Sequence, residues 1–204
     1  MAAQKYDGYT ALILAGGHAR RFKGRHKPLA QLWGKTLLEH QLEVLEPLFK
    51  DILLITNDPE PFQAYRTIRI KPDIIPDMGP LGGIHSGLHH TRQPCLFVVA
   101  GDMPFIQKNV IRQQIQRSRQ YPDQVILPRK GTKIEPLHAI YPKTVQRALE
   151  KIIQTSSDRS IRTFISHIAH HYWDVQNDTP FININTHEAL TRYKAFSNHK
   201  DQKR

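Results

Sequence analysis

The feature that most constrains the fold is an apolar run, residues 9–14, that ends in Ala15-Gly16-Gly17. The run is too short to be a typical helix and is bounded by glycines, so it predicts a buried strand. Glycine has no Cβ, so the backbone at these positions can adopt positive φ and lie directly against a ligand. Consecutive amides turned outward in this way form a concave anion site.

Basic side chains crowd the segment that follows the glycines. Their cationic groups are donors that match phosphate oxygens. They are Arg20, Arg21, Lys23, Arg25 and Lys27. Strand, glycine turn and cations together predict a polyphosphate site, and the alternative is a glycine turn beside a solvated basic loop. The Walker loop is excluded because six residues separate Gly17 from Gly24 and Arg25-His26 follow. The Gly-x-Gly-x-x-Gly dinucleotide fingerprint is absent as well.

Length and composition set the broad class of the protein. A chain of 204 residues fits one α/β domain, which we expect over residues 1–196, with a basic disordered tail at 197–204. Cys95 is the single cysteine, which excludes a disulfide framework and favours a reducing compartment. No apolar run approaches the roughly 20 residues of a membrane span, so we expect a cytoplasmic protein without a membrane partner. The formal charge of +11 indicates anionic partners, whether nucleic acid or nucleotides.

The order of helical and extended segments predicts the fold. Thr36 and Glu39 form a capping box for a helix over residues 37–45, and an apolar strand follows at 52–56. Strand, helix and strand within about fifty residues make a βαβ unit with a parallel sheet. Further strands are expected at 67–70, 96–100, 125–127, 137–141 and 172–174, and further helices from 84 and at 106–120, 143–154, 160–168 and 187–195. The prediction is a single-domain three-layer α/β sandwich, with a mostly parallel Rossmann-like sheet and helices on both faces.

Candidate ligand-binding residues follow four of the predicted strands. They are Gly16-Gly17, with their backbone amides, and Asn57, Asp73 and Asp102. Ligands of open parallel sheets bind at the carboxyl ends of the strands, so these residues are expected to meet at one edge. Asp102 follows the most apolar strand directly and is placed to hold Mg²⁺ beside a phosphate site. The alternative for Asp102 is a carboxylate that caps the turn before Pro104, and Asn57 by itself predicts only a turn.

Several short motifs, in order along the chain, resemble one enzyme family. They are Leu14-Ala15-Gly16-Gly17, Lys27-Pro28, Gly79-Pro80-Leu81-Gly82-Gly83, Asp102-Met103-Pro104-Phe105 and Asn183-Ile184-Asn185-Thr186. Together they resemble the molybdenum cofactor guanylyltransferase (MobA) family, within the glycosyltransferase-A-like nucleotidyltransferases. The resemblance extends from Leu12 to about Leu190. The chain departs from the family pattern at His26, where the family usually has Asp, and at Gly101, where it has Cys.

The resemblance implies a nucleotidyltransferase domain of the nucleotide-diphospho-sugar transferase type. It implies transfer of GMP from GTP to molybdenum-molybdopterin, with Mg²⁺ on Asp102 and catalytic roles for Lys27, Asp102 and Arg21. GTP-binding residues carried over from the family are Leu14, Ala15, Gly16, Gly17, Lys27, Asn57, Asp73 and Asp102. Partners implied are GTP, molybdenum-molybdopterin, other proteins of molybdenum cofactor biosynthesis and recipient molybdoenzymes.

Asn183 and Asn185 would share a face of an extended segment. There they could hold the second substrate or order metal-bound water, or they could simply cap the final helix.

Three other interpretations stay open. The same fold could use CTP or another phosphorylated acceptor. A nucleic-acid-binding module would need stacking aromatics beside the cations, and the basic loop offers only Phe22. A nucleotide sensor without catalysis is the third. Two histidine groups, His85/His89/His90 and His167/His170/His171, are expected to be solvated or capping residues instead of metal ligands.

Overall fold

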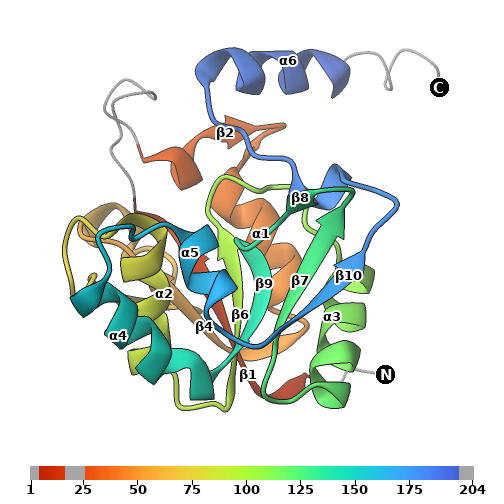
Figure 1. The fold of residues 1–204 in the computed structure, drawn as a ribbon. Helices are drawn as coiled ribbons and strands as arrows, with labels where there is room; N and C mark the ends of the chain where they lie inside the picture. Colours follow the sequence, from red (N-terminus) through yellow and green to blue (C-terminus); the bar gives the residue numbers. More distant parts are fainter. Residues whose placement is uncertain (1–4, 17–25, 198–204) are drawn as a thin grey trace.

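A central sheet of eight strands organises the molecule, in the order β10-β7-β9-β6-β1-β4-β5 with β8 paired to β7 (Figure 1). The computed structural model describes residues 5–16 and 26–197. The strands are β1 (Tyr6–Leu14), β4 (Phe49–Ile55), β5 (Arg69–Lys71), β6 (Cys95–Ala100), β7 (Val125–Lys130), β8 (Lys133–Ile134), β9 (His138–Pro142) and β10 (His170–Asp174). The predicted strands are thus all present, with ends shifted by a few residues.

Most neighbouring strands of the sheet run parallel. Strand β1 pairs in parallel with β4 and β6, β4 with β5, and β7 with β10. Strand β9 is antiparallel to both β6 and β7. The chain reverses after β7 at Gly131, whose φ is +59°, a value that glycine adopts without strain. This tight turn joins β7 to its antiparallel partner β8, and β9, which follows β8, also runs antiparallel to β7.

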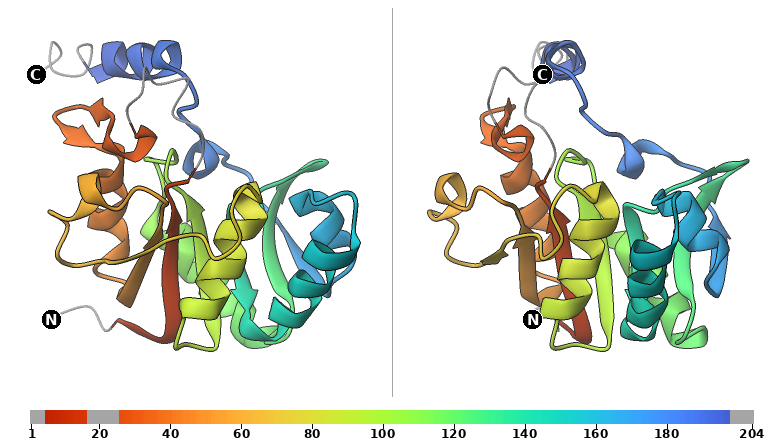
Figure 2. Two further views of the ribbon diagram at one scale, coloured as in Figure 1. Left: turned by 90° about the vertical axis from the view of Figure 1, so that its left-hand side faces the viewer. Right: turned by 60° about the vertical axis from the view of Figure 1, so that its left-hand side comes forward.

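Helices cover both faces of the sheet (Figure 2). Helices α1 (Leu37–Leu45) and α3 (Lys108–Gln120) pack on one face, and α2 (Gly79–His90), α4 (Gln146–Thr155) and α5 (Ile161–Ser166) on the other. Alternate residues of β1 serve the two layers, since Ala11 and Ile13 point into the first core and Leu12 into the second. The predicted three-layer sandwich is confirmed.

The first helix begins as the sequence predicts. The Thr36 hydroxyl accepts from the Glu39 amide at 3.1 Å, and the Glu39 carboxylate accepts from the Thr36 amide at 2.6 Å. This reciprocal pair satisfies two amides that the helix itself cannot use. It sets the point at which α1 leaves the small hairpin of β2 (Gln31–Leu32) and β3 (Lys35–Thr36).

A third, smaller core joins the hairpin to the last helix, α6 (His187–Ser197). Helix α6 lies above the hairpin in Figure 1. Leu32, Leu37, Ile184 and Leu190 are buried together, and Phe105 packs against them. Three segments that are distant in the sequence, around residues 32–37, 105 and 184–190, are therefore held by one apolar cluster. In the described part of the chain there are also four short 3-10 helices: η2 (Lys27–Leu29), η3 (Glu60–Phe62), η4 (Lys143–Val145) and η5 (Thr179–Phe181).

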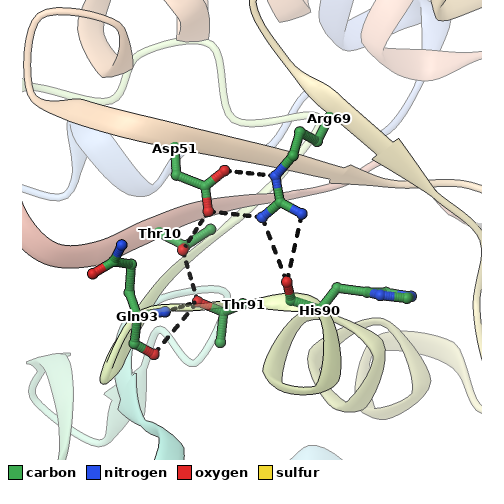
Figure 3. A network of polar contacts seen from close by, with 6 residues as sticks. All are labelled: Thr10, Asp51, Arg69, His90, Thr91 and Gln93. Atoms are coloured by element: carbon green, nitrogen blue, oxygen red, sulfur yellow. Dashed lines mark hydrogen bonds and ion pairs between the residues drawn. The ribbon is translucent and has the colours of Figure 1, made fainter.

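A polar network connects strands β1, β4 and β5 at positions away from their carboxyl ends (Figure 3). Arg69 donates two hydrogen bonds of 2.7 Å to the Asp51 carboxylate, and Thr10 donates a third at 2.7 Å. Thr10 also bonds to Thr91, which ends α2. Partial burial opposes ionisation of Asp51, but the hydrogen bonds from Arg69 and Thr10 outweigh it and hold the pKa of this carboxyl below its usual value.

Within the described residues, none of the helices combines the length and apolar character that crossing a membrane requires.

Candidate active site

The carboxyl ends of three central strands lie side by side. In the register of the sheet, Leu14 of β1 is level with Ile55 of β4 on one side and Ala100 of β6 on the other. The chain stays in contact just beyond these residues, because the Ala15 amide donates to the Ile55 carbonyl and the Gly101 amide to the Leu14 carbonyl. The segments that carry Gly16, Asn57 and Asp102 therefore begin at one edge, as the topology of parallel strands requires.

Three predicted residues from distant segments meet at this edge. Lys27 Nζ lies 3.1 Å from Asp102 Oδ2 and 3.0 Å from Asn185 Oδ1. Lys27 opens η2, where Pro28 is buried and fixes the backbone, so the lysine leaves a rigid turn. A cation, a carboxylate and an amide thus share one partly shielded position.

The turn that carries Asp102 is closely packed. A Cβ at Gly101 would lie 2.7 Å from Pro28 Cγ and 2.9 Å from the Leu14 carbonyl oxygen, closer than a real side chain tolerates. Glycine at this position therefore lets the loop of Lys27 lie against the turn. Asp102 Oδ1 is buried without a hydrogen-bond partner, while Oδ2 faces Lys27. One carboxylate oxygen consequently remains available to a ligand.

A second polar group lies at the ends of β4 and β5. The Asn57 side chain donates to Asp73 Oδ2 at 3.2 Å and accepts from the Asp73 amide at 2.9 Å. Glycines border the carboxylate, since a Cβ at Gly16 would lie 3.7 Å from its Oδ2 and one at Gly82 3.8 Å from its Oδ1. Burial raises the pKa of Asp73, and the Asn57 hydrogen bond offsets this only in part. A carboxylate whose charged form is disfavoured by burial is typical of ligand sites.

The two asparagines near the carboxyl end lie in residues 182–185, which belong to no hydrogen-bonded strand. They differ in their contacts. The Asn183 side chain makes a local contact, donating to the Phe181 carbonyl at 3.3 Å, while the Asn185 side chain accepts from Lys27. Neither asparagine caps α6: that role belongs to Thr186, whose hydroxyl accepts from the Ala189 amide at 3.1 Å.

The histidines of the two groups lie in different surroundings. In the described part of the chain, no three His, Cys, Asp or Glu side chains gather in a way that could hold a metal ion. The His167 ring donates from Nδ1 to the Thr163 carbonyl at 2.7 Å, and His171 stacks on Tyr121. His85 is the correction: it is buried on α2, with its Nε2 3.6 Å from a carboxylate oxygen of Glu150 on the neighbouring helix α4.

Two site residues of the prediction, Gly17 and Arg21, lie outside the described residues, as do Arg20, Lys23 and Arg25. Leu14 is the last residue of β1 and Ala15 follows it. A Cβ at Gly83 would lie 2.6 Å from Leu14 Cδ2, so α2 approaches the strand closely there. Sequence reasoning missed two contacts to the Asp102 turn: the Ile184 amide donates to the Asp102 carbonyl at 2.8 Å, and Gln41 bonds to its flanks. The only signal for Gln41 in the sequence is that it is a polar residue on an otherwise apolar face of a predicted helix.

The arrangement has a clear chemical capacity. A carboxylate with one unpaired oxygen, beside an ammonium group, can hold a divalent cation and a phosphate oxygen together. The Asn57–Asp73 pair adds directional acceptors and donors for a polar ligand group.

Comparison with known proteins identifies the family. Residues 11–172 match the model of the MobA-like NTP transferase domain. The chain is 33% identical to a molybdenum cofactor guanylyltransferase of Syntrophotalea carbinolica over 192 residues, covering 91% of this chain and 90% of that protein. It is 30% identical to one from Bradyrhizobium sp. over 211 residues, with 99% of each chain covered. Among solved structures it is similar to the molybdopterin-guanine dinucleotide biosynthesis protein A of Archaeoglobus fulgidus, with a TM-score of 0.79, 26% identity, and 93% and 99% of the two chains covered. With the family model spanning most of its length, the chain belongs to the MobA-like NTP transferases.

Proposed function

We propose that this protein transfers GMP from GTP to the terminal phosphate of molybdenum-molybdopterin, releasing pyrophosphate and forming the molybdopterin guanine dinucleotide cofactor. The observation that carries the proposal is the meeting of Lys27, Asp102 and Asn185 at the carboxyl edge of the sheet. Support comes also from relatives named for guanylyl transfer that match nearly the whole chain.

The reaction is an in-line displacement at phosphorus. An oxygen of the acceptor's terminal phosphate bonds to the α-phosphorus of GTP, and the bond from that phosphorus to the bridging oxygen breaks, so that pyrophosphate leaves with the electron pair. The acceptor phosphate is already ionised, so no general base is needed. Positioning and charge stabilisation then supply most of the catalysis. Lys27 would stabilise the charge on the phosphoryl oxygens, and Arg21 is proposed as a second cation for the leaving group.

Asp102 is the proposed holder of Mg²⁺. The residues fit that ion, because Asp102 Oδ1 is a buried oxygen without a protein partner, and Mg²⁺ is commonly held by one or two carboxylates together with substrate phosphates. When bound there, the ion would neutralise charge on the phosphates. Lys27 holds the other oxygen of the same carboxylate and thereby fixes its orientation.

The remaining residues would position the two substrates. Asn57 and Asp73 are proposed to contact the guanosine part of GTP, with the backbone of residues 14–17 against the nucleotide. The raised pKa of Asp73 supports this role, because burial disfavours a charge that a ligand's donors could stabilise. Asn185, and with it Asn183, is proposed to face the acceptor or metal-bound water.

One assay tests the activity. Pyrophosphate release should be measured with GTP, CTP, ATP and UTP, each with and without molybdenum-molybdopterin and Mg²⁺. We expect release that requires GTP, the acceptor and a divalent cation. A preference for CTP would instead indicate the related cytidylyl transfer. Binding of GTP that never yields pyrophosphate would indicate a nucleotide sensor, and a DNA or RNA gel shift insensitive to GTP would indicate a nucleic-acid-binding protein.

The proposal includes interaction with proteins that deliver molybdopterin and with recipient molybdoenzymes, in the cytoplasm.

A further inference from the structure

We infer that Gln41 is a positioning residue that sets the location of Asp102 relative to Lys27. The inference rests on the proposed function, since it assigns Gln41 a role through the metal-binding carboxylate. Gln41 lies on α1 and is fully buried, and its hydrogen bonds go to backbone carbonyls and not to the Asp102 side chain.

The side-chain amide of Gln41 clamps the Asp102 turn from both sides. Its Nε2 donates to the Ala100 carbonyl at 2.7 Å and to the Met103 carbonyl at 2.9 Å. Both of its hydrogens are therefore used, and the two acceptors stand directly before and after Gly101-Asp102. The Met103 amide also donates to the Ala100 carbonyl at 3.1 Å, so Gln41 reinforces a turn that the backbone closes on its own.

Helix α1 also contacts the segment that carries Lys27. The Leu37 amide at its first turn donates to the Ala30 carbonyl at 3.0 Å, and Ala30 in turn donates to the Lys27 carbonyl. The next turn of the same helix carries Gln41. One rigid element thus holds the loop of the lysine at its start and the turn of the carboxylate one turn later, and this fixes the spacing of the ion pair.

Packing alone does not explain a glutamine at this position. Gln41 Oε1 is buried without a hydrogen-bond partner, so the residue leaves one polar atom uncompensated. Its neighbours on the same buried face of α1 are Leu38, Leu42 and Leu45. An apolar residue would fill the position without this penalty, whereas only an amide can hold both carbonyls.

The chain provides a closely matched control in Gln114 of α3. Gln114 is also fully buried, donates one hydrogen bond of 2.8 Å to a backbone carbonyl, that of His138, and leaves its Oε1 unpaired. Its bond is to the first residue of β9, which is level with Val99 of β6, and not to the Asp102 turn itself. Replacement of either glutamine removes the same kind of buried contact, but only one of them holds the catalytic turn.

The test compares Gln41→Met with Gln114→Met in the full-length protein. For each, kcat, the KM for GTP and the Mg²⁺ concentration at half-maximal rate should be measured, with the melting temperature as a check on folding. We expect Gln41→Met to lower kcat by about 10- to 100-fold and to raise the half-maximal Mg²⁺ concentration at least about threefold, because small displacements of a catalytic group are costly. The KM for GTP should change less than about twofold. Gln114→Met should change none of these three by more than about twofold. Equal changes in both variants, or an unchanged Mg²⁺ requirement in Gln41→Met, would overturn the inference.

A second variant keeps the shape of the side chain. Gln41→Glu can donate one hydrogen bond when its buried carboxyl is protonated and none when it is ionised. Its kcat as a fraction of wild type should therefore rise as the pH is lowered from about 8 to about 6, and a constant fraction would count against the inference.

A second measurement distinguishes failure of the proposed function from failure of the positioning role. If the wild-type protein releases no pyrophosphate, calorimetric titration of GTP with and without Mg²⁺ still compares the two Met variants. Loss of the Mg²⁺ effect in Gln41→Met alone would support the positioning role without the activity. Wild-type protein that neither turns over nor binds GTP in a Mg²⁺-dependent way would refute both.

Discussion

Lys27 and Asp102, 75 residues apart in the chain, form an ion pair with 3.1 Å between Nζ and Oδ2 at the carboxyl edge of the sheet. Their side chains are 27% and 13% exposed, so water screens the pair less than a pair on the surface. The cation and the carboxylate are held in place before any substrate arrives. Preorganised charge of this kind needs no rearrangement as the reaction proceeds.

Replacement of Lys27 by alanine is expected to lower kcat by about 10²- to 10³-fold, because a positioned charge that stabilises the transition state is lost. Pyrophosphate release and thermal melting measure activity and folding in the same samples. The control is Lys50→Ala, which removes an exposed ion pair to Asp7, with a distance of 2.7 Å, far from the site. Equal activity of Lys27→Ala and wild type would remove Lys27 from the mechanism.

Replacement of Asp102 by asparagine is expected to abolish the Mg²⁺-dependent part of the activity, because a neutral amide is a weak ligand for this ion. The measurement is the rate as a function of Mg²⁺ concentration. Asp174→Asn is the matched control, since it breaks the exposed ion pair between Asp174 of β10 and Arg129 of β7. A normal Mg²⁺ response in Asp102→Asn would show that the ion binds elsewhere.

Asp73→Asn is expected to weaken GTP binding while raising the melting temperature by about 1–3 °C. Burial raises the pKa of Asp73, so the folded protein holds an unfavourable charge at neutral pH that an amide would remove. The carbonyl of the new side chain can still accept from Asn57. Calorimetric titration with GTP and a thermal melt test the two halves, and tighter GTP binding by the variant would contradict the assignment of Asp73.

The burial of His138 predicts that the free energy of unfolding depends on pH. It is fully buried between Phe97 and Phe181, and neither ring nitrogen has a hydrogen-bond partner. Burial lowers its pKa to about 4 from an ordinary value of 6.5. Between these values the unfolded chain binds a proton that the folded chain does not. Stability is therefore complete above about pH 6.5 and falls by about 1.4 kcal/mol per unit as the pH drops toward 4.

The measurement for His138 is the free energy of unfolding from denaturant titrations between pH 7 and about 4.5. The variant His138→Leu lacks the titrating ring but keeps the other ionisable groups, so the difference between the two proteins isolates the histidine. Parallel pH profiles would show that the His138 ring is not shielded from protonation in the folded state.

Local patterns along the chain account for most of the fold. The run ending at Leu14, the capping box of Thr36 and Glu39, and the apolar strand before Asp102 each depend on neighbours in the sequence, and all three are present as predicted. The rule that ligands bind beyond the carboxyl ends of parallel strands then anticipated that Asn57, Asp73 and Asp102 would lie beyond those ends. The exact ends of elements, such as α3 beginning at Lys108 and not at 106, depend on packing that periodicity does not encode.

By itself, the sequence determined the layered fold, the family and the edge of the sheet at which the polar residues collect, because these follow from periodicity, motif order and strand direction. Only the tertiary structure decided which residues touch. Asn185 reaches Lys27 while Asn183 does not, His85 is buried, and Gln41 clamps the Asp102 turn. Each of these contacts joins segments far apart in the chain or depends on how a loop is folded, and such distances are set by three-dimensional packing instead of local pattern.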